Sequence, residues 1–168
     1  MGKAETDEGI TRFLQSLAKL NTGERARLKR CAGRRLAEAP EVLGLFYRVL
    51  PPGVGAASED TYFLTATLFP FADGTAEGNL GDSLRRARDD RNRSGLDRRV
   101  ERILDADESQ LAFLLRQSVR YLGARQVALN WHALLDDLLG WSYPSRSVQK
   151  RWARAYFAQS VEATPKEA

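Results

Sequence analysis

The sequence predicts an all-α protein in which about eight or nine helices pack into a compact bundle. Two observations carry this prediction. Apolar residues recur every three to four positions in each apolar segment, whereas no stretch alternates apolar and polar residues as a half-buried strand does. Glycine and proline fall between these periodic segments. With 168 residues, 43% of them hydrophobic and 29% charged, the chain is long enough to bury a core and has a globular composition.

Four helices are expected in the first half of the chain. The second begins at the cap Thr22, and the third opens with Pro40, which the first turn of a helix tolerates. Ser58 is expected to cap the fourth, which is apolar nearly all round and therefore buried. Residues 72–79, rich in glycine and polar residues, are expected to form a linker or mobile loop. The expected helical ranges are 6–20, 22–36, 40–50 and 59–69.

Five further helices are expected after this linker. Gly123 is the expected C-terminal stop of the third of them, since glycine commonly ends a helix. Each of the five follows a residue whose short polar side chain can cap a helix. These caps are Asn79, Ser94, Asp107, Asn130 and Ser145.

We expect residues 1–168 to form a single domain, which can divide into two packed helical sub-bundles at 5–72 and 79–160. Residues 161–168 are expected to be a flexible tail. No apolar run approaches the ~18–20 residues that span a bilayer, and the charged N-terminus lacks the apolar core of a signal peptide. The expected location is therefore the cytoplasm, with no membrane partner.

The sequence supplies little for catalysis. Its single cysteine, Cys31, and single histidine, His132, exclude a disulfide framework and a cysteine-cluster or multi-histidine metal site. No Walker motif or dinucleotide fingerprint is present. His132 and Asp136 lie four residues apart on one predicted helix, so a small helical enzyme is a rival interpretation, although no nucleophile completes such a site. We expect no catalytic residue, no metal site and no cofactor.

Charge is distributed unevenly along the chain, although the net charge is only +4. Residues 12–35 hold eight basic side chains and one acidic one, and residues 116–154 hold seven basic and two acidic ones. Between them, residues 36–83 hold seven acidic side chains and one basic one. Of the 26 basic residues, 21 are arginine, whose guanidinium makes forked contacts to phosphate that lysine cannot make.

Three predicted helices carry basic side chains opposite an apolar face, around Arg30, Arg116 and Arg146, and this favours a groove for a polyanion. No helix with a polar, base-reading face is evident, and no set of exposed aromatic residues stands out, because the tryptophans and most tyrosines and phenylalanines fall on apolar stripes. Contact with the nucleic-acid backbone, without sequence readout, is therefore favoured. The candidate nucleic-acid-binding residues are Lys29, Arg30, Arg34, Arg116, Arg120, Arg146, Lys150 and Arg151.

Six motifs occur in the order and rough spacing of a known family. They are LFYRVLP (45–51), LGDSLRRAR (80–88), DRRVERIL (97–104), LAFLLRQSVRYL (111–122), LNWHALLDDLLGW (129–141) and SVQKRWARAYF (147–157). Together they resemble the small subunit of the type I-E CRISPR surveillance complex, the CasB family of Cascade. The match runs from about Leu20 to Phe157.

This resemblance implies a non-catalytic, all-helical subunit of a complex built on a guide RNA. Two copies would contact the backbone subunits and the large subunit, and would help to hold the R-loop formed on target DNA. Their basic surface would follow the displaced strand. Glu108 falls where at least one relative places an arginine, whereas Arg34, Arg120, Lys150 and Arg151 rest on helix geometry alone. The family's basic positions match Lys29, Arg30 and Arg116, and Arg146 falls near the family's basic position before the last helix.

Two further interpretations remain open. In the first, the chain is purely an interaction subunit, whose basic faces contact guide RNA and other subunits without binding DNA. In the second, it is a helical DNA-binding regulator. The sequence does not set the copy number, the oligomeric state of the isolated chain, or which basic face meets which strand.

Overall fold

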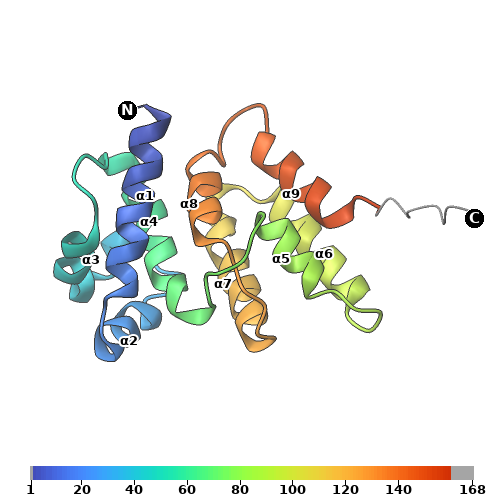
Figure 1. Ribbon diagram of the computed structural model, residues 1–168, viewed down its shortest axis with the longest axis horizontal. Helices are drawn as coiled ribbons and strands as arrows, with labels where there is room; N and C mark the ends of the chain where they lie inside the picture. Colours follow the sequence, from blue (N-terminus) through green and yellow to red (C-terminus); the bar gives the residue numbers. More distant parts are fainter. Residues whose placement is uncertain (1, 160–168) are drawn as a thin grey trace, which may run out of the picture.

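The computed structural model describes residues 2–159. This part of the chain contains nine α-helices and three short 3-10 helices, and no strand (Figure 1). The all-α prediction is confirmed. The predicted tail, 161–168, lies outside the described residues. The elements are α1 (Lys3–Ala18), α2 (Thr22–Arg30), η1 (Leu36–Glu38), η2 (Pro40–Val42), α3 (Leu43–Val49), α4 (Ala56–Leu68), η3 (Phe69–Phe71), α5 (Leu80–Arg86), α6 (Arg93–Asp105), α7 (Glu108–Ala124), α8 (Trp131–Leu139) and α9 (Ser147–Phe157).

The buried side chains form two hydrophobic clusters. One is built mainly from α1 to α4, with Leu135 of α8, and its largest members include Phe13, Phe46 and Phe63, which are fully buried. The other is built mainly from α5 to α9. Figure 1 shows α1 to α4 on one side of the molecule and α5, α6 and α9 on the other, with α7 and α8 between them. Burying each such aromatic or leucine side chain contributes about 1.5–3 kcal/mol. The division into sub-bundles 5–72 and 79–160 stays a prediction.

Three of the predicted helix caps are confirmed. The side-chain oxygens of Asn79, Asp107 and Asn130 each accept a hydrogen bond from a backbone N–H in the first turn, at 3.0–3.3 Å. These bonds are local, so the sequence alone specifies them.

None of the helices in residues 2–159 is long and apolar enough to cross a membrane.

The predicted cap Thr22 is wrong, because Asn21 caps α2 and its side-chain oxygen accepts from the Glu24 N–H at 2.9 Å. The three predicted serine caps are wrong as well. The residues before α4, α6 and α9 are Gly55, Asn92 and Arg146, and none of them makes a side-chain capping bond. Ser58 lies inside α4, where its backbone N–H bonds to the Gly55 carbonyl oxygen at 2.9 Å. A backbone turn can therefore start a helix without a capping side chain. The spacing of residues in the sequence does not show whether a helix starts with a side-chain cap or with such a turn.

The second predicted helix, expected over 22–36, ends early. It stops at Arg30, and Gly33 follows with a φ of +89°, a left-handed conformation that glycine adopts without strain. A Cβ at Gly33 would lie 3.3 Å from Cδ of Arg116, so the turn is packed against α7. As a result, Arg34 lies beyond the helix and does not share a helical face with Arg30.

The segment 72–79 contains no helix, as expected, but it is held in place. The backbone N–H of Leu129 donates to the Asp73 carbonyl oxygen at 2.8 Å, and the indole Nε1 of Trp131 donates to the Ala72 carbonyl oxygen at 3.2 Å. These bonds tie the residues after η3 to the start of α8.

Candidate nucleic-acid interface

The ring of Phe71, at the end of η3, lies beneath two cations from different helices. The Lys29 ammonium from α2 is 4.7 Å from the ring centroid, and the Arg120 guanidinium carbon from α7 is 5.9 Å from it. A cation over an aromatic face gains about 0.5–1 kcal/mol at an exposed site. Phe71 therefore brings together positive charges that are 91 positions apart in the sequence (120 minus 29).

Gly123 explains how α7 approaches Phe71 so closely. A Cβ at position 123 would lie 1.9 Å from the carbonyl oxygen of Phe71, well inside van der Waals contact. The sequence interpretation, in which Gly123 stops the helix, is wrong, because α7 continues to Ala124 and Arg125 caps it. The glycine is needed for close packing between α7 and η3.

Arg116 lies one turn before Arg120 on α7, and its side chain rests against the turn that follows α2. Its Nε is buried without a hydrogen-bond partner. Arg30, the last residue of α2, is exposed. We call the surface formed by Lys29, Arg30, Arg116 and Arg120 the α2–α7 basic surface.

The α2–α7 basic surface has little acidic charge beside it on its own helices. No acidic residue occurs from 109 to 125, and the acid of α2, Glu24, is engaged by an ion pair with Arg48 of α3. None of the four cations forms an ion pair with a residue in the range 2–159. Arginines with unpaired guanidinium groups are suited to forked contacts with phosphate.

Arg34 is engaged elsewhere. Its guanidinium forms an ion pair with Glu41 and also donates to the backbone carbonyl of Glu38. A backbone hydrogen bond at Glu41 and the bond from Arg34 lower the pKa of the Glu41 carboxyl, whereas burial raises the pKa of the nearby Cys31 thiol. Arg34 thus fastens the loop between α2 and α3, and its contacts do not join it to the α2–α7 basic surface.

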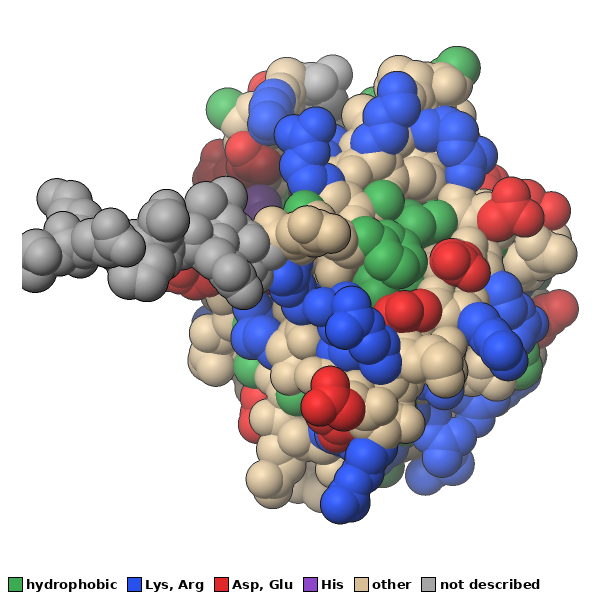
Figure 2. All heavy atoms as spheres, turned by 90° about the vertical axis from the view of Figure 1, so that its right-hand side faces the viewer, with side chains coloured by type: hydrophobic (Ala, Val, Ile, Leu, Met, Phe, Trp, Pro, Cys, Tyr) green, Lys and Arg blue, Asp and Glu red, His purple; other side chains and the backbone are tan. Residues whose placement is uncertain are grey.

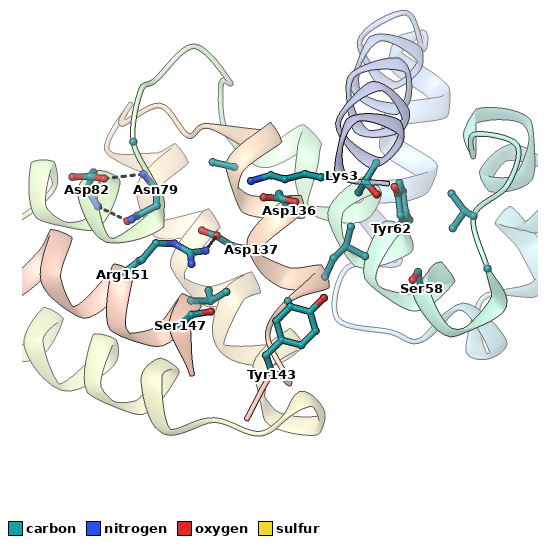
Figure 3. A pocket seen from close by; sticks show the side chains of 18 residues that line it. Lys3, Ser58, Tyr62, Asn79, Asp82, Asp136, Asp137, Tyr143, Ser147 and Arg151 are labelled. Atoms are coloured by element: carbon teal, nitrogen blue, oxygen red, sulfur yellow. Dashed lines mark hydrogen bonds and ion pairs between the residues drawn. The ribbon is translucent and has the colours of Figure 1, made fainter. Parts of the chain in front are cut away.

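Arg151 also has a structural partner. It forms an ion pair with Asp137, which is only 5% exposed, at the wall of a cleft of about 940 Å³ (Figure 3). Both halves of the molecule line this cleft, with Lys3 from α1 and Tyr143 from the segment before α9. Lys150 is exposed. Figure 1 shows α9, which carries Lys150 and Arg151, on the opposite side of the molecule from α2. The structure therefore does not bring these two cations to the α2–α7 basic surface.

Arg146 occupies a separate hollow. It precedes α9 with a φ of +50°, and its guanidinium donates to the Leu104 carbonyl. The hollow has a volume of about 630 Å³ and is also lined by Arg35, which lines a second hollow of about 430 Å³ that contains Gly33. Glu108 lines both hollows, so the charge there is mixed. Arg35 thus lies between Arg146 and the Gly33 turn.

Sequence reasoning did not include Arg35 among the candidate residues. The predicted helix 22–36 includes Arg35, but α2 ends at Arg30, so helical periodicity could not place this side chain. The available signal was its place at the end of the basic segment 12–35.

The face formed by α5, α6 and α9 is another place where basic side chains gather. Figure 2 shows Lys and Arg side chains spread across this side of the molecule, with acidic side chains between them. Two arginines in segments next to these helices have partners: Arg88, after α5, lies 5.0 Å from the ring centroid of Tyr156 of α9, and Arg125, after α7, pairs with Asp89 at 2.9 Å. This face has mixed charge and differs in that respect from the α2–α7 basic surface.

The rival enzymatic interpretation required His132 to be oriented by Asp136. In the structure, Nε2 of His132 instead lies 3.3 Å from the carbonyl oxygen of Asp7, to which it donates, so the imidazole contacts α1. Across residues 2–159, no three His, Cys, Asp or Glu side chains gather in a way that could hold a metal ion.

Comparisons with known proteins agree on one family. Residues 24–157 match the model of the family described as CRISPR-associated protein Cse2. A curated Cse2 protein of Thermus thermophilus is 31% identical over 166 residues, covering 93% of this chain and 94% of the relative.

Solved structures show the same relationship. The crystal structure of a Cse2-family protein from Thermus thermophilus is 28% identical, covers 89% of this chain and 98% of that one, and gives a TM-score of 0.77. A chain in a structure described as a CRISPR RNA-guided surveillance complex is 26% identical, with 90% and 92% coverage and a TM-score of 0.77. CasB of M. ruber is 27% identical, with 90% and 92% coverage and a TM-score of 0.70. With a family model that spans most of its length and a fold shared with these relatives, the chain belongs to the Cse2 (CasB) family of CRISPR-associated proteins.

Proposed function

We propose that the chain is a non-catalytic subunit of a type I-E CRISPR RNA-guided surveillance complex. In this role it binds the nucleic-acid backbone through the α2–α7 basic surface and stabilises the R-loop by holding the displaced strand of target DNA. The proposal draws on the family and on the relative found in a surveillance complex. Its partners would be the large and backbone subunits, a second copy of the chain, guide RNA and target DNA.

One observation carries the nucleic-acid part of this proposal. Lys29 and Arg120 lie over the ring of Phe71, and Arg116 rests on the turn after α2. Cations from two helices therefore form one surface, and none of them is paired with an acidic side chain within residues 2–159. R-loop formation is a nearly balanced exchange, because the heteroduplex formed is about as stable as the duplex lost. A few backbone contacts can therefore tip the balance toward the open state.

The expected binding is weak and independent of sequence, because contacts to phosphate carry no base information. If about four to six phosphates of a single strand are neutralised, log affinity falls with log salt with a slope of about −3 to −4. Each lost phosphate contact reduces the magnitude of that slope by about 0.7.

The test compares two charge-matched double variants in assembled complexes. Arg116→Ala with Arg120→Ala removes two cations from the α2–α7 basic surface, and Arg98→Ala with Arg102→Ala removes two cations from α6. We expect the first pair to slow R-loop formation and reduce its salt dependence, and the second to have little effect. Thermal melting checks that both variants remain folded.

Two outcomes would contradict the proposal. If the Arg116/Arg120 variant folds and forms R-loops at the normal rate and stability, the chain acts as an interaction subunit without direct DNA binding. If instead the Arg98/Arg102 variant causes the larger defect, the mixed-charge face of α6 holds the nucleic acid.

A further inference from the structure

Phe113 is a large aromatic side chain that the fold leaves in solvent. It is 55% exposed, although it lies in the middle of α7, a helix that packs against the protein core. The residues of α7 that face the core are Leu111, Leu114, Leu115, Ser118, Val119 and Leu122. At 100° per residue, Phe113 points to the opposite side, so its exposure follows from its position on the helix and not from local unfolding.

The neighbours of Phe113 on this outer side are polar or basic. Ser109 and Gln117 lie one turn away in either direction, Arg116 lies three positions on, and Arg120 shares its side of the helix two turns on. The rise of 1.5 Å per residue places Phe113 and Arg120 about 10 Å apart along the axis. The outer side of α7 therefore carries the exposed ring of Phe113 and the exposed Arg120, with the half-buried Arg116 between them along the helix.

This composition is unlike the core of a protein–protein interface, where several apolar side chains gather. Within residues 2–159 the other exposed large hydrophobic side chains lie on α3, before α9 and at the end of α9, not on α7. An aromatic ring beside cations along one track is how single strands are held, with bases stacked on the ring and phosphates on the cations.

We propose that Phe113 stacks against a base of a bound single strand whose phosphates lie along Arg116 and Arg120. This inference rests on the proposed function and deepens it, since it assigns Phe113 to the bases of the strand whose phosphates the α2–α7 basic surface holds. Stacking tolerates any base, because every base has a π-face. It therefore adds affinity without adding sequence preference.

The experiment separates stacking from phosphate contact. The full-length chain is titrated with a labelled oligothymidylate of about 16 nucleotides, the upper end of the site size of a single binding module, and with an abasic strand of equal length and charge. We expect Phe113→Ala to weaken binding of the oligothymidylate by about 5- to 140-fold, the range for losing one stacked base, and to leave the abasic strand unaffected. Phe113→Trp is expected to retain or improve binding.

Tyr47→Ala is the matched control. Tyr47 is similarly exposed, at 49%, but its hydroxyl donates to Glu59 and places the ring beside an acid. We expect this variant to bind both strands as the unmodified chain does. The salt slope of Phe113→Ala is also expected to stay unchanged, because no phosphate contact is removed.

The possible failures are distinguishable. If the unmodified chain binds neither strand, the proposed function fails and this inference fails with it. If the chain binds with the expected salt slope but Phe113→Ala weakens neither strand or both equally, only the stacking role is wrong. If Phe113→Ala leaves both affinities intact but prevents assembly with the other subunits, Phe113 serves protein docking and the inference is overturned.

Discussion

The indole Nε1 of Trp152 donates a hydrogen bond of 2.6 Å to the carboxylate of Asp137. Both residues are buried, and the other carboxylate oxygen of Asp137 is paired with Arg151 at the wall of the large cleft (Figure 3). The ring of Trp152 also packs against Trp141, with centroids 5.0 Å apart. These contacts hold α9 against α8, and the exposed Arg151 takes part in them through its ion pair with Asp137.

Trp152→Ala is expected to lower the free energy of unfolding by about 3–5 kcal/mol, because it leaves a cavity beneath α9. The hydrogen bond to Asp137 is lost as well. For a chain of this size, each kcal/mol lowers the melting temperature by about 2–4 °C. Thermal and urea unfolding measure the loss, and nucleic-acid binding is expected to disappear only where the protein unfolds. A variant that melts normally would show that Trp152 is not a packing residue.

Arg151→Ala is expected to destabilise the protein without reducing the salt dependence of binding. The variant leaves the buried carboxylate of Asp137 with Trp152 as its remaining donor. Leaving a buried polar group under-satisfied costs about 1–3 kcal/mol. Lys150→Ala removes the same charge from an exposed neighbour and is expected to change stability by no more than about 0.5 kcal/mol. Normal melting of Arg151→Ala together with a smaller salt slope would instead assign Arg151 to phosphate binding.

The helical class could be predicted because periodicity is local, and the caps Asn79, Asp107 and Asn130 could be predicted because each bonds within its own first turn. The end of α2 could not be predicted from the sequence, because the turn at Gly33 packs against Arg116, which lies more than 80 positions away on α7. Local signals specify elements, and tertiary packing decides where several of them end.

The candidate site shows the same limit. Helical spacing could identify Arg116 and Arg120 as outward-facing, but it could not show that Lys29 would join Arg120 over Phe71, because that meeting depends on how η3 packs on α7. Nor could it show that Glu41 would engage Arg34, since the loop between them has no periodicity. Charge counting therefore identified basic side chains, and it could not select which of them share a surface.

The stability of the protein is expected to depend on the ionised form of Asp107. Hydrogen bonds from the Ser109 hydroxyl and from the Gln110 backbone N–H lower the pKa of this carboxyl below its ordinary value of 3.8. The unfolded chain then takes up a proton at a higher pH than the folded chain does, so the stabilisation is present above pH 3.8 and is lost as the pH falls through the folded pKa.

Asp107→Asn is the variant that tests this pH dependence, because asparagine keeps a capping oxygen but does not titrate. Urea unfolding from about pH 7 to about pH 3 is expected to show a shallower acid loss for the variant than for the unmodified chain. Parallel curves over that range would show that Asp107 contributes nothing to the pH dependence.

Gly123→Ala is expected to disturb both the fold and the α2–α7 basic surface. Its methyl group would lie 1.9 Å from the Phe71 carbonyl oxygen, a backbone atom that can yield only if η3 or α7 moves. Overpacking of this kind costs about 1–3 kcal/mol. Because Phe71 lies under Lys29 and Arg120, the movement is also expected to weaken single-strand binding at temperatures where the variant is fully folded.

Gly9→Ala in α1, where a Cβ meets nothing within 4 Å, is the control, and it is expected to gain about 0.5–1 kcal/mol of stability with unchanged binding. If Gly123→Ala melts and binds like the unmodified chain, the close approach of α7 to Phe71 does not set the geometry of this surface.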